Sequence, residues 1–455
     1  MITLYAAQWV LPMTTAAADA INDGAVAVDG ALVVGVGPRA QMLARFPRAT
    51  MQDYGVAAIL PGLVNCHTHL ELTAMRGYLE PEESNFLAWL KKLTLARMLK
   101  LTPDDLFASA AWGAVEAARA GVTCVGDASS SAADSLRALR EVGLRGTVYQ
   151  EVFGPDPIIA GDQLEKLREQ VEGLRPLVTE LVRVGVSPHS PYTVSAKLLE
   201  MVADDAIAER LPLMIHAAES EAEELLLREN QGLFAESFQE RGIEWHAPGL
   251  SPVQYLAACG VLRARPLLAH CVRVDRRDIE TISETGATVA HCPKSNAKLG
   301  HGRAPYRLLR QTNCGLGSDS VASNNTCDIL EEARFALLMS RASLSPSANE
   351  SEPPGAHEVL TDATVGGARA LNYENLIGTL AEGKQADLIA VRLDGAHQSP
   401  IYDPARALIF SSSGRDVMLT VIAGREVFRD GRVTTVDEDH LRARMSEIGK
   451  KLMTS

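Results

Sequence analysis

Eight short apolar runs, separated by segments with a helical pattern, occupy the chain from residue 59 to about residue 345. Eight strands that alternate with helices form a parallel sheet that closes into a (β/α)8 barrel. One intervening segment carries clear helix signals, with Thr102 as N-cap, Pro103 at the first helical position and Gly121 as the stop. We therefore expect an α/β protein built on a TIM barrel. The predicted strands are 59–69, 121–128, 145–153, 183–189, 211–217, 265–271, 286–292 and 314–319.

Both ends of the chain show a different pattern, with short alternating strands and tight turns. The first 58 residues contain a hairpin signal at Asp29 and Gly30, and a strand-and-turn pattern returns after residue 375. A chain of 455 residues is long enough for one large barrel plus an accessory domain. We expect residues 1–58 and 376–455 to form one small β-sandwich domain, and residues 59–375 to form the catalytic barrel.

The charge balance argues against one class of partner. The chain has 57 acidic and 44 basic residues and a net charge of −13, whereas nucleic acids and anionic membranes are bound by clustered Lys and Arg. Its first twenty residues lack the positive region of a signal peptide, and no apolar run approaches the length of a membrane span. Seven cysteines without CxxC pairing indicate free thiols in a reducing compartment. We expect a cytoplasmic protein without nucleic-acid or membrane partners.

Two histidines, His67 and His69, end the first predicted barrel strand in the stretch PGLVNCHTHLEL. Alternate residues of a strand face the same side, so both imidazoles are expected to point in one direction. Barrel enzymes place their active sites at the C-terminal ends of the strands. The pair is therefore either half of a metal site or two hydrogen-bonded core histidines.

Four later strands are predicted to bring further polar groups to the same rim. His189, His216, His270 and Asp319 each end an apolar run, and Glu219 follows three residues after His216. Taken singly, a histidine here is more often a hydrogen-bonded polar residue, and Asp319 also fits a helix N-cap. Taken together, burying these groups without a shared purpose costs several kcal/mol. Imidazole and carboxylate donors suit a divalent ion such as zinc or iron, with one position left for water.

These motifs together resemble the amidohydrolase superfamily. Its pattern is HxH after the first strand, HxxE after the fifth, His after the sixth and Asp after the eighth. The segments HTHLELTAMRG, SPHSPYTVS, HAAESEAE, HCPKSNAKLG and LGSDSVASNN are similar to its nucleobase and nucleoside deaminase and chlorohydrolase branch. The resemblance covers nearly the whole chain. It points to deaminases of adenosine derivatives, namely S-adenosylhomocysteine, methylthioadenosine and aminodeoxyfutalosine.

The resemblance implies a mechanism as well as a fold. A bound metal ion lowers the pKa of its water toward 7, and Glu219 takes the proton of that water and passes it to a ring nitrogen. His270 hydrogen-bonds the hydroxide and the developing oxyanion, while Asp319 relays a second proton to the leaving ammonia. The reaction replaces an exocyclic amine on a purine-type ring. The resemblance implies one divalent metal per chain, zinc or else iron, held by His67, His69, His216 and Asp319.

The same resemblance suggests substrate contacts. Trp89, in the segment NFLAWL, belongs either to a lid over an aromatic base or to the apolar face of a packed helix. Glu71 is either a substrate contact or a surface carboxylate. The nine residues after Trp89 contain no acid, whereas S-adenosylhomocysteine deaminases typically carry a ribose-binding Glu there, so a substrate with a different tail fits this chain. The expected substrate contacts are His189, Trp89, Glu71, Arg145 and Ser320.

Three alternatives stay open at this point. The first is a triazine- or guanine-type amino- or chlorohydrolase of the same branch. The second is a two-metal amidase or lactonase, for which Glu151 is the only candidate for a bridging ligand. The third is a non-catalytic barrel kept as a scaffold. By analogy with the family, we expect a small-molecule substrate and a homo-oligomer.

Overall fold

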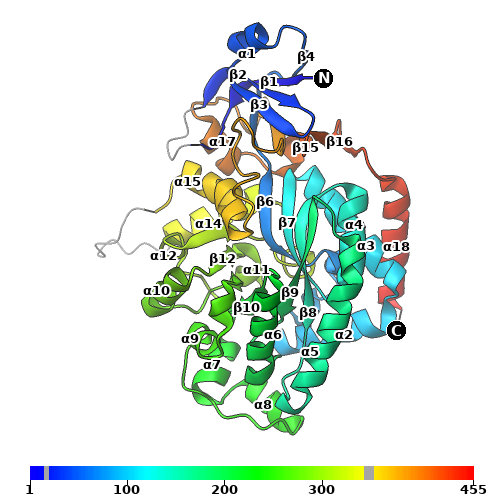
Figure 1. Ribbon diagram of the computed structural model, residues 1–455, viewed down its shortest axis with the longest axis vertical. Coiled ribbons are helices and arrows are strands. Elements are labelled where there is room, and N and C mark those ends of the chain that lie inside the picture. Colours follow the sequence, from blue (N-terminus) through cyan, green and yellow to red (C-terminus); the bar gives the residue numbers. More distant parts are fainter. Residues whose placement is uncertain (15–19, 343–352, 455) are drawn as a thin grey trace.

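Eight parallel strands form the barrel wall in the computed structural model, which describes residues 1–14, 20–342 and 353–454 (Figure 1). They lie in two four-stranded sheets, ordered β6-β7-β8-β9 and β10-β11-β12-β13. A bridge between Val186 and Leu213 joins β9 to β10, and β13 packs beside β6, so the predicted barrel is confirmed. The strands are β6 (Leu63–Thr68), β7 (Val122–Ser129), β8 (Arg145–Val152), β9 (Val182–Pro188), β10 (Met214–Ala217), β11 (Leu267–His270), β12 (Thr288–His291) and β13 (Asn313–Leu316).

Helices cover the outside of this wall. Helix α3 begins where the sequence predicts, because the Thr102 side chain accepts the N–H of Asp105 and Asp105 accepts the N–H of Thr102. The helices of this region are α2 (Phe86–Lys100), α3 (Pro103–Arg119), α4 (Ala132–Val142), α5 (Ala160–Leu174), α6 (Ala196–Glu209), α7 (Glu221–Glu229), α8 (Leu233–Glu240), α9 (Pro252–Ala258), α10 (Arg276–Thr285), α11 (Pro293–Lys298), α12 (Tyr306–Leu309), α13 (Val321–Asn324), α14 (Ile329–Ala342), α15 (Ala356–Thr361) and α16 (Gly367–Ala370).

The first predicted strand, 59–69, is two strands in the structure. β5 (Ala57–Pro61) belongs to the sheet formed by the chain ends, and β6 starts the barrel at Leu63. Gly62 lies between them, and a Cβ there would lie 2.1 Å from the Thr123 hydroxyl oxygen. The close packing of Thr123 therefore requires a glycine where the chain passes from one sheet to the other.

The two ends of the chain build one sheet, as predicted. Its order is β17-β16-β15-β14-β5-β1-β2-β3, with β4 paired to β1. Gly30 has φ 56° in the turn between β2 and β3, which confirms the hairpin expected at Asp29 and Gly30. The domain limits at 58/59 and 375/376 stay a prediction. The remaining strands are β1 (Thr3–Val10), β2 (Ile21–Asp29), β3 (Leu32–Pro38), β4 (Thr50–Asp53), β14 (Leu388–Arg392), β15 (Val417–Ile422), β16 (Arg425–Arg429) and β17 (Arg432–Val433).

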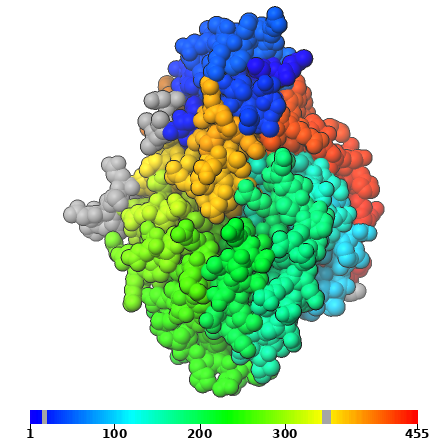
Figure 2. Space-filling model, in the orientation of Figure 1, coloured from blue at the N-terminus to red at the C-terminus, as the bar shows by residue number. Residues whose placement is uncertain are grey.

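The terminal sheet gathers at one end of the molecule, where the blue N-terminal and red C-terminal segments meet (Figure 2). β5 and β14 pair antiparallel and join the two chain ends. Tyr5, Val26, Ile59, Leu388 and Leu419, each from a different strand of this sheet, share one apolar core. Burial of this common face holds together segments that are far apart in the sequence.

The last helix leaves the terminal sheet and packs on the barrel. α18 (Glu438–Met453) lies along α3 (Figure 1), and the carboxylate of Asp105 accepts Lys451 Nζ at 2.6 Å and Arg444 Nη2 at 3.1 Å. Ion pairs at the start of α3 therefore anchor the C-terminal helix. Within the described ranges, no helix combines the length and hydropathy needed to cross a membrane.

Candidate active site

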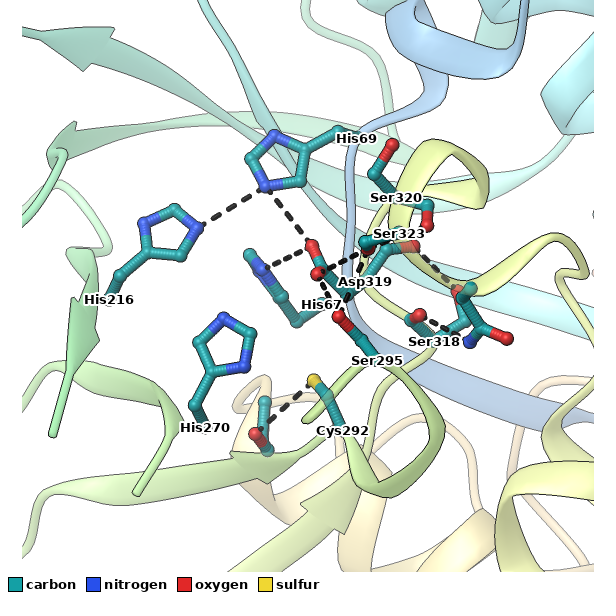
Figure 3. A network of polar contacts seen from close by, with 12 residues as sticks. His67, His69, His216, His270, Cys292, Ser295, Ser318, Asp319, Ser320 and Ser323 are labelled. Carbon is teal, nitrogen blue, oxygen red and sulfur yellow. Dashed lines mark hydrogen bonds and ion pairs between the residues drawn. The ribbon is translucent and has the colours of Figure 1, made fainter. Parts of the chain in front are cut away.

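Four imidazoles and one carboxylate meet at the C-terminal ends of the barrel strands (Figure 3). β6 carries His67, which is followed by His69, while His216 lies in β10, His270 ends β11, and Asp319 follows β13. Asp319 Oδ1 lies 3.3 Å from Nε2 of His67 and 3.5 Å from Nε2 of His69. The Nε2 atoms of His69 and His216 are 3.3 Å apart. Four strand ends thus bring together five residues that are far apart in the sequence, apart from the pair His67 and His69.

The donors fit a cation. Ligand atoms of His67, His69 and Asp319 lie within 4.8 Å of one another, as do those of His67, His216 and His270. Among the described residues, Nε2 of His67 and Nε2 of His270 are buried without a hydrogen-bond partner. Burial lowers the pKa of His67 to about 4 and the pKa of His216 well below its usual value. These imidazoles are therefore neutral at pH 7 and offer lone pairs to a metal ion.

Hydrogen bonds behind the site orient two of the rings. Nδ1–H of His216 donates to the backbone oxygen of His189 at 2.8 Å, which turns Nε2 toward the site. Nδ1–H of His270 donates to Oδ1 of Asn296 at 2.9 Å and leaves its Nε2 facing inward. Such outer contacts fix the tautomer and the direction of a metal-binding imidazole.

The carboxylate of Asp319 is fixed in a similar way. Its Oδ2 accepts hydrogen bonds from Ser295 Oγ at 2.6 Å and Ser323 Oγ at 2.7 Å, which leaves Oδ1 to face His67 (Figure 3). Burial opposes the charge, but His67 and the neighbouring histidines outweigh it and hold the pKa of Asp319 well below its usual value. Asp319 is therefore an anionic donor.

The backbone is strained at these strand ends. Ala218 has φ 53°, His270 has φ 77° and Asp319 has φ 57°, all in the left-handed region. A non-glycine residue held there costs about 1–3 kcal/mol and persists only where the surrounding structure enforces it. Such strain clusters at functional sites, in agreement with the position of these residues around the donor atoms.

Glu219 lies beside the donors with its carboxylate between two imidazoles. Oε1 is 3.6 Å from Nε2 of His270 and 3.5 Å from Nε2 of His301, and Oε2 accepts the Tyr192 hydroxyl at 3.1 Å. Burial raises the pKa of Glu219, but His270 and His301 outweigh burial and lower the pKa to about 2. The group is a carboxylate at neutral pH and has the charge of a base.

His301 is a residue that the sequence interpretation missed. Polar residues that end apolar runs were selected from the sequence, and His301 ends no such run. In the structure it follows α11, in the loop after strand β12, and only 8% of it is exposed. One feature of the sequence could have identified it: His301 follows a predicted barrel strand, and the loops after the strands form the rim that carries the site.

A cavity of about 430 Å³ opens above the donors. Its walls are mainly aromatic and aliphatic. Trp89 stacks on Phe86 at 6.1 Å between ring centroids, and both project from α2 into this space. Trp89 also packs in a buried apolar cluster, as expected for the apolar face of a packed helix, and a lid over an aromatic base stays a prediction. The apolar lining comprises Leu72, Phe86, Trp89, Leu90, Leu93, Met98, Phe153, Tyr192 and Leu299.

The family model described as "Amidohydrolase family" matches residues 58–427. The chain belongs to the amidohydrolase family. A 5-methylthioadenosine/S-adenosylhomocysteine deaminase of Syntrophobacter fumaroxidans is 34% identical over 437 residues, which are 95% of this chain and 94% of that protein. The enzyme of the same name from Pyrococcus furiosus is 33% identical over 404 residues, with 87% and 90% covered.

Solved structures resemble this amidohydrolase over its full length. An adenosine deaminase from Xanthomonas campestris with bound zinc has a TM-score of 0.85 and 28% identity, and the match covers 100% of this chain and 99% of that one. An atrazine chlorohydrolase from Arthrobacter aurescens, complexed with zinc, has a TM-score of 0.83 and 24% identity, with 98% and 100% covered. The second likeness concerns the fold alone. Together with the donor set, family membership indicates a site for a divalent metal ion.

Four of the expected substrate contacts line the cavity of this amidohydrolase, namely His189, Trp89, Glu71 and Ser320. Glu71 is not a surface carboxylate, since only 2% of it is exposed. It accepts hydrogen bonds from the Ser129 hydroxyl and, at 2.8 Å, from the N–H of Ser131, and Arg97 Nε lies 3.1 Å away. The roles of these four residues in substrate binding stay predictions.

The expectation that Arg145 contacts substrate is wrong. Arg145 is the first residue of β8 and therefore lies at the end of the barrel opposite to the site. Its guanidinium is fully buried and donates from Nε and Nη2 to the two carboxylate oxygens of Asp387, both at 2.9 Å. This bidentate pair joins the floor of the barrel to the terminal sheet.

Proposed function

We propose that this amidohydrolase is a metal-dependent deaminase that replaces the exocyclic amine of an adenosine derivative with oxygen and releases ammonia. The observation that carries the proposal is the Glu219 carboxylate, set between two imidazoles beside the cluster of metal donors and below an aromatic cavity. The names of relatives at 32–35% identity support the same substrate class. Methylthioadenosine, S-adenosylhomocysteine and aminodeoxyfutalosine are the candidate substrates.

One divalent ion, zinc in our proposal, would be held by His67, His69, His216 and Asp319. Bound there, such an ion lowers the pKa of a water molecule toward 7 and so makes hydroxide available at neutral pH. The neutral state of His67 and His216 and the ionised state of Asp319 support this assignment. A similar solved structure, 28% identical in sequence to this chain, contains bound zinc, which supports the choice of metal.

The protein's own groups then move the protons. Tyr192 holds Oε2 of Glu219, so Oε1 is the oxygen free to accept a proton from water and deliver it to a ring nitrogen of the base. Nε2 of His270 points at the same space and hydrogen-bonds the attacking oxygen. Asp319 Oδ1 relays the second proton to the departing ammonia. The apolar walls around Trp89 exclude other water from the reaction.

The test is a screen of ammonia release by the zinc-loaded protein. Substrates are adenosine, methylthioadenosine, S-adenosylhomocysteine, aminodeoxyfutalosine, adenine, guanine, cytosine and a chlorotriazine, with chloride measured in parallel. We expect ammonia from at least one adenosine derivative and about one metal ion per chain. Chloride release would favour the triazine alternative, and about two metal ions per chain would favour the two-metal alternative. No release of either product contradicts the proposed function.

The proposal extends to the location and the partners of the enzyme. We place the enzyme in the cytoplasm, as a homo-oligomer without nucleic-acid or membrane partners. The net charge of −13 supports the absence of a nucleic-acid partner. Size-exclusion chromatography with light scattering tests the homo-oligomer.

A further inference from the structure

Among the described residues that line the cavity, four carry a carboxylate: Glu71, Glu151, Glu219 and Asp319. Glu71 is occupied by the Ser129 hydroxyl, backbone N–H groups and Arg97. Asp319 is fixed by two serines and faces the donor histidines, and Glu219 is held by Tyr192 between two imidazoles. Three of the four acids thus have partners that define what they do. Glu151 differs.

One oxygen of Glu151 has no partner. Oε2 accepts the Ser130 hydroxyl at 2.6 Å, whereas Oε1 is buried and, within the described part of the chain, makes no hydrogen bond. Nδ1 of His69 lies 4.0 Å from Oε1, and ligand atoms of Glu151, His189 and His216 lie within 4.8 Å of one another. Only 8% of Glu151 is exposed. A buried acceptor left unpaired destabilises a fold, so a group of this kind in a cavity wall needs a reason outside the folded chain itself.

Glu151 lies in the cavity wall, where a ligand can reach its unpaired oxygen. The residue lies next to the end of β8, and the ring of Phe153, two positions on, lies tilted against the ring of His189, with 4.8 Å between centroids. Nδ1 of His189 is already within hydrogen-bond distance of Ser190 and Thr193. The rest of the His189 ring and the Glu151 carboxylate lie with Thr193 and Ser130 in a polar part of the cavity wall.

Helix α2 cannot supply the same function. Helix α2 lines the cavity with Phe86, Trp89, Leu90, Leu93 and Thr94, and its sequence contains no Asp or Glu. Its one cation in the cavity, Arg97, is paired with Glu71. Glu151 is therefore the remaining carboxylate that a substrate can reach without displacing a partner inside the protein.

We propose that Glu151 is a specificity-determining residue whose Oε1 accepts a hydrogen bond from a donor group on the substrate. The inference rests on the proposed function. The edges of an adenine ring offer acceptor nitrogens, and its amine lies at the reacting carbon beside Glu219. The donor for Glu151 is thus a sugar hydroxyl of a nucleoside or, in a free base, a ring N–H. The chemistry is the same in both cases, a neutral donor meeting a buried carboxylate.

The experiment pairs variants of Glu151 with substrates that lack one donor each. Wild type, Glu151→Ala and Glu151→Gln are assayed for ammonia release from adenosine, 2′-deoxyadenosine, 3′-deoxyadenosine and adenine. Glu151→Gln keeps the size of the side chain and guards against a folding defect in the alanine variant. Glu180→Gln, at an exposed position, is the matched control and should equal wild type. Bound metal is measured in every preparation.

The expected result is a loss that depends on the substrate. Wild type should lose about 10- to 100-fold in kcat/KM when the contacted hydroxyl is removed, as expected for a hydrogen bond to a charged group. Glu151→Ala should show the same loss with adenosine, mostly in KM, and no further loss with that deoxy analogue. With adenosine, the kcat/KM of Glu151→Gln should lie between those of wild type and Glu151→Ala. An effect confined to the nucleosides identifies a sugar hydroxyl, and an effect confined to adenine identifies a ring N–H.

Other results overturn the inference. A loss of similar size with all four substrates, or no loss with any, means that Glu151 does not read a substrate donor. A fall in bound metal in both Glu151 variants makes the residue a metal ligand instead, as in a two-metal site. If wild type deaminates none of the purines, the proposed function fails and this inference fails with it. That outcome is distinct from ammonia release with a uniform loss, which contradicts the role of Glu151 alone.

Discussion

The Glu219 carboxylate lies 3.6 Å from Nε2 of His270, and the two side chains are 5% and 1% exposed. They come from the ends of different barrel strands, so this approach is a product of the fold and not of local sequence. A buried carboxylate normally has a raised pKa, but here the imidazoles of His270 and His301 reverse the effect. The pair is arranged so that a base stays ionised in a site with little water.

The first prediction concerns Glu219→Gln. The amide cannot accept the proton from water, so the turnover number should fall by at least about 10²- to 10⁴-fold. The metal should stay bound, because Glu219 is not among the proposed ligands. Ammonia release and elemental analysis measure the two quantities. A wild-type rate would remove Glu219 from the mechanism.

Loss of metal is the second prediction, for His216→Ala. Its Nε2 faces His69 and its Nδ1 is fixed by the backbone of His189, so the alanine variant removes an oriented donor. Metal content after dialysis should drop well below one ion per chain. His291→Ala is the matched control, since His291 also ends a strand but stacks on Tyr306, with 4.9 Å between ring centroids, and does not line the cavity above the donors. Unchanged metal in His216→Ala would refute its role as a ligand.

Much of this arrangement follows from the sequence because a barrel has a simple rule for its strand ends. Polar residues that end apolar runs, such as His67, His216 and Asp319, were expected on one rim and they meet there. The rule gives no help with loops, which explains why His301 was missed. The rule also does not show where a long apolar run divides between two sheets. The predicted strand 59–69 divides at Gly62, and this division depends on the packing of Thr123.

The misplacement of Arg145 has a different cause. The sequence indicated the right strand, but the residue begins β8 instead of ending it, and its partner Asp387 lies 242 positions away. The resemblance to the deaminase branch favoured a substrate contact. A long-range ion pair leaves no signal in the spacing of neighbouring residues, so only the folded chain reveals it.

Removal of this ion pair gives the third prediction. Arg145→Met leaves the Asp387 carboxylate buried without its partner, so the free energy of unfolding should fall by about 3–5 kcal/mol. The site at the other end of the barrel should keep its metal and its kcat. Urea unfolding of the metal-loaded protein measures the change. Wild-type stability with a raised KM would instead return Arg145 to the substrate site.

A fourth prediction links pH to the docking of α18. Burial raises the pKa of Asp105, but hydrogen bonds from Lys451 and Thr102 outweigh burial and hold the pKa below its usual value. The stabilisation is therefore present above the unfolded-state pKa of about 3.9 and is lost as pH falls through the lower folded-state value. Asp105→Asn should lower the free energy of unfolding by about 1–2 kcal/mol at pH 7.

The difference in free energy of unfolding between Asp105→Asn and wild type should become smaller in acid. Both proteins carry a neutral side chain at position 105 once pH falls below the folded-state pKa of Asp105. Urea unfolding at pH 7 and near pH 3 provides the comparison. An equal gap at both pH values would show that charge on Asp105 does not anchor α18.

The last prediction concerns His301→Gln and the pH profile of the reaction. The positive charge that His301 can carry helps to hold the pKa of Glu219 at about 2. A glutamine carries no charge, so the pKa of Glu219 should rise, and a smaller fraction of Glu219 is ionised in acid. The acid limb of kcat/KM, which reports the free enzyme, should therefore move to higher pH. Because the pKa of Glu219 in wild type is about 2, the loss relative to wild type should be confined to the acid end of the profile, near pH 4.

Ammonia release between pH 4 and 9 measures this shift. His397→Gln is the control, because His397 lies with its side chain 56% exposed beside Asp416, outside the cavity. Its profile should match that of wild type. A uniform drop of His301→Gln at every pH would instead assign His301 to packing against Phe86, whose ring it meets edge-on at 4.6 Å. Movement of the acid limb is the result that only an electrostatic effect on Glu219 produces, because lost packing leaves the charge of the carboxylate unchanged.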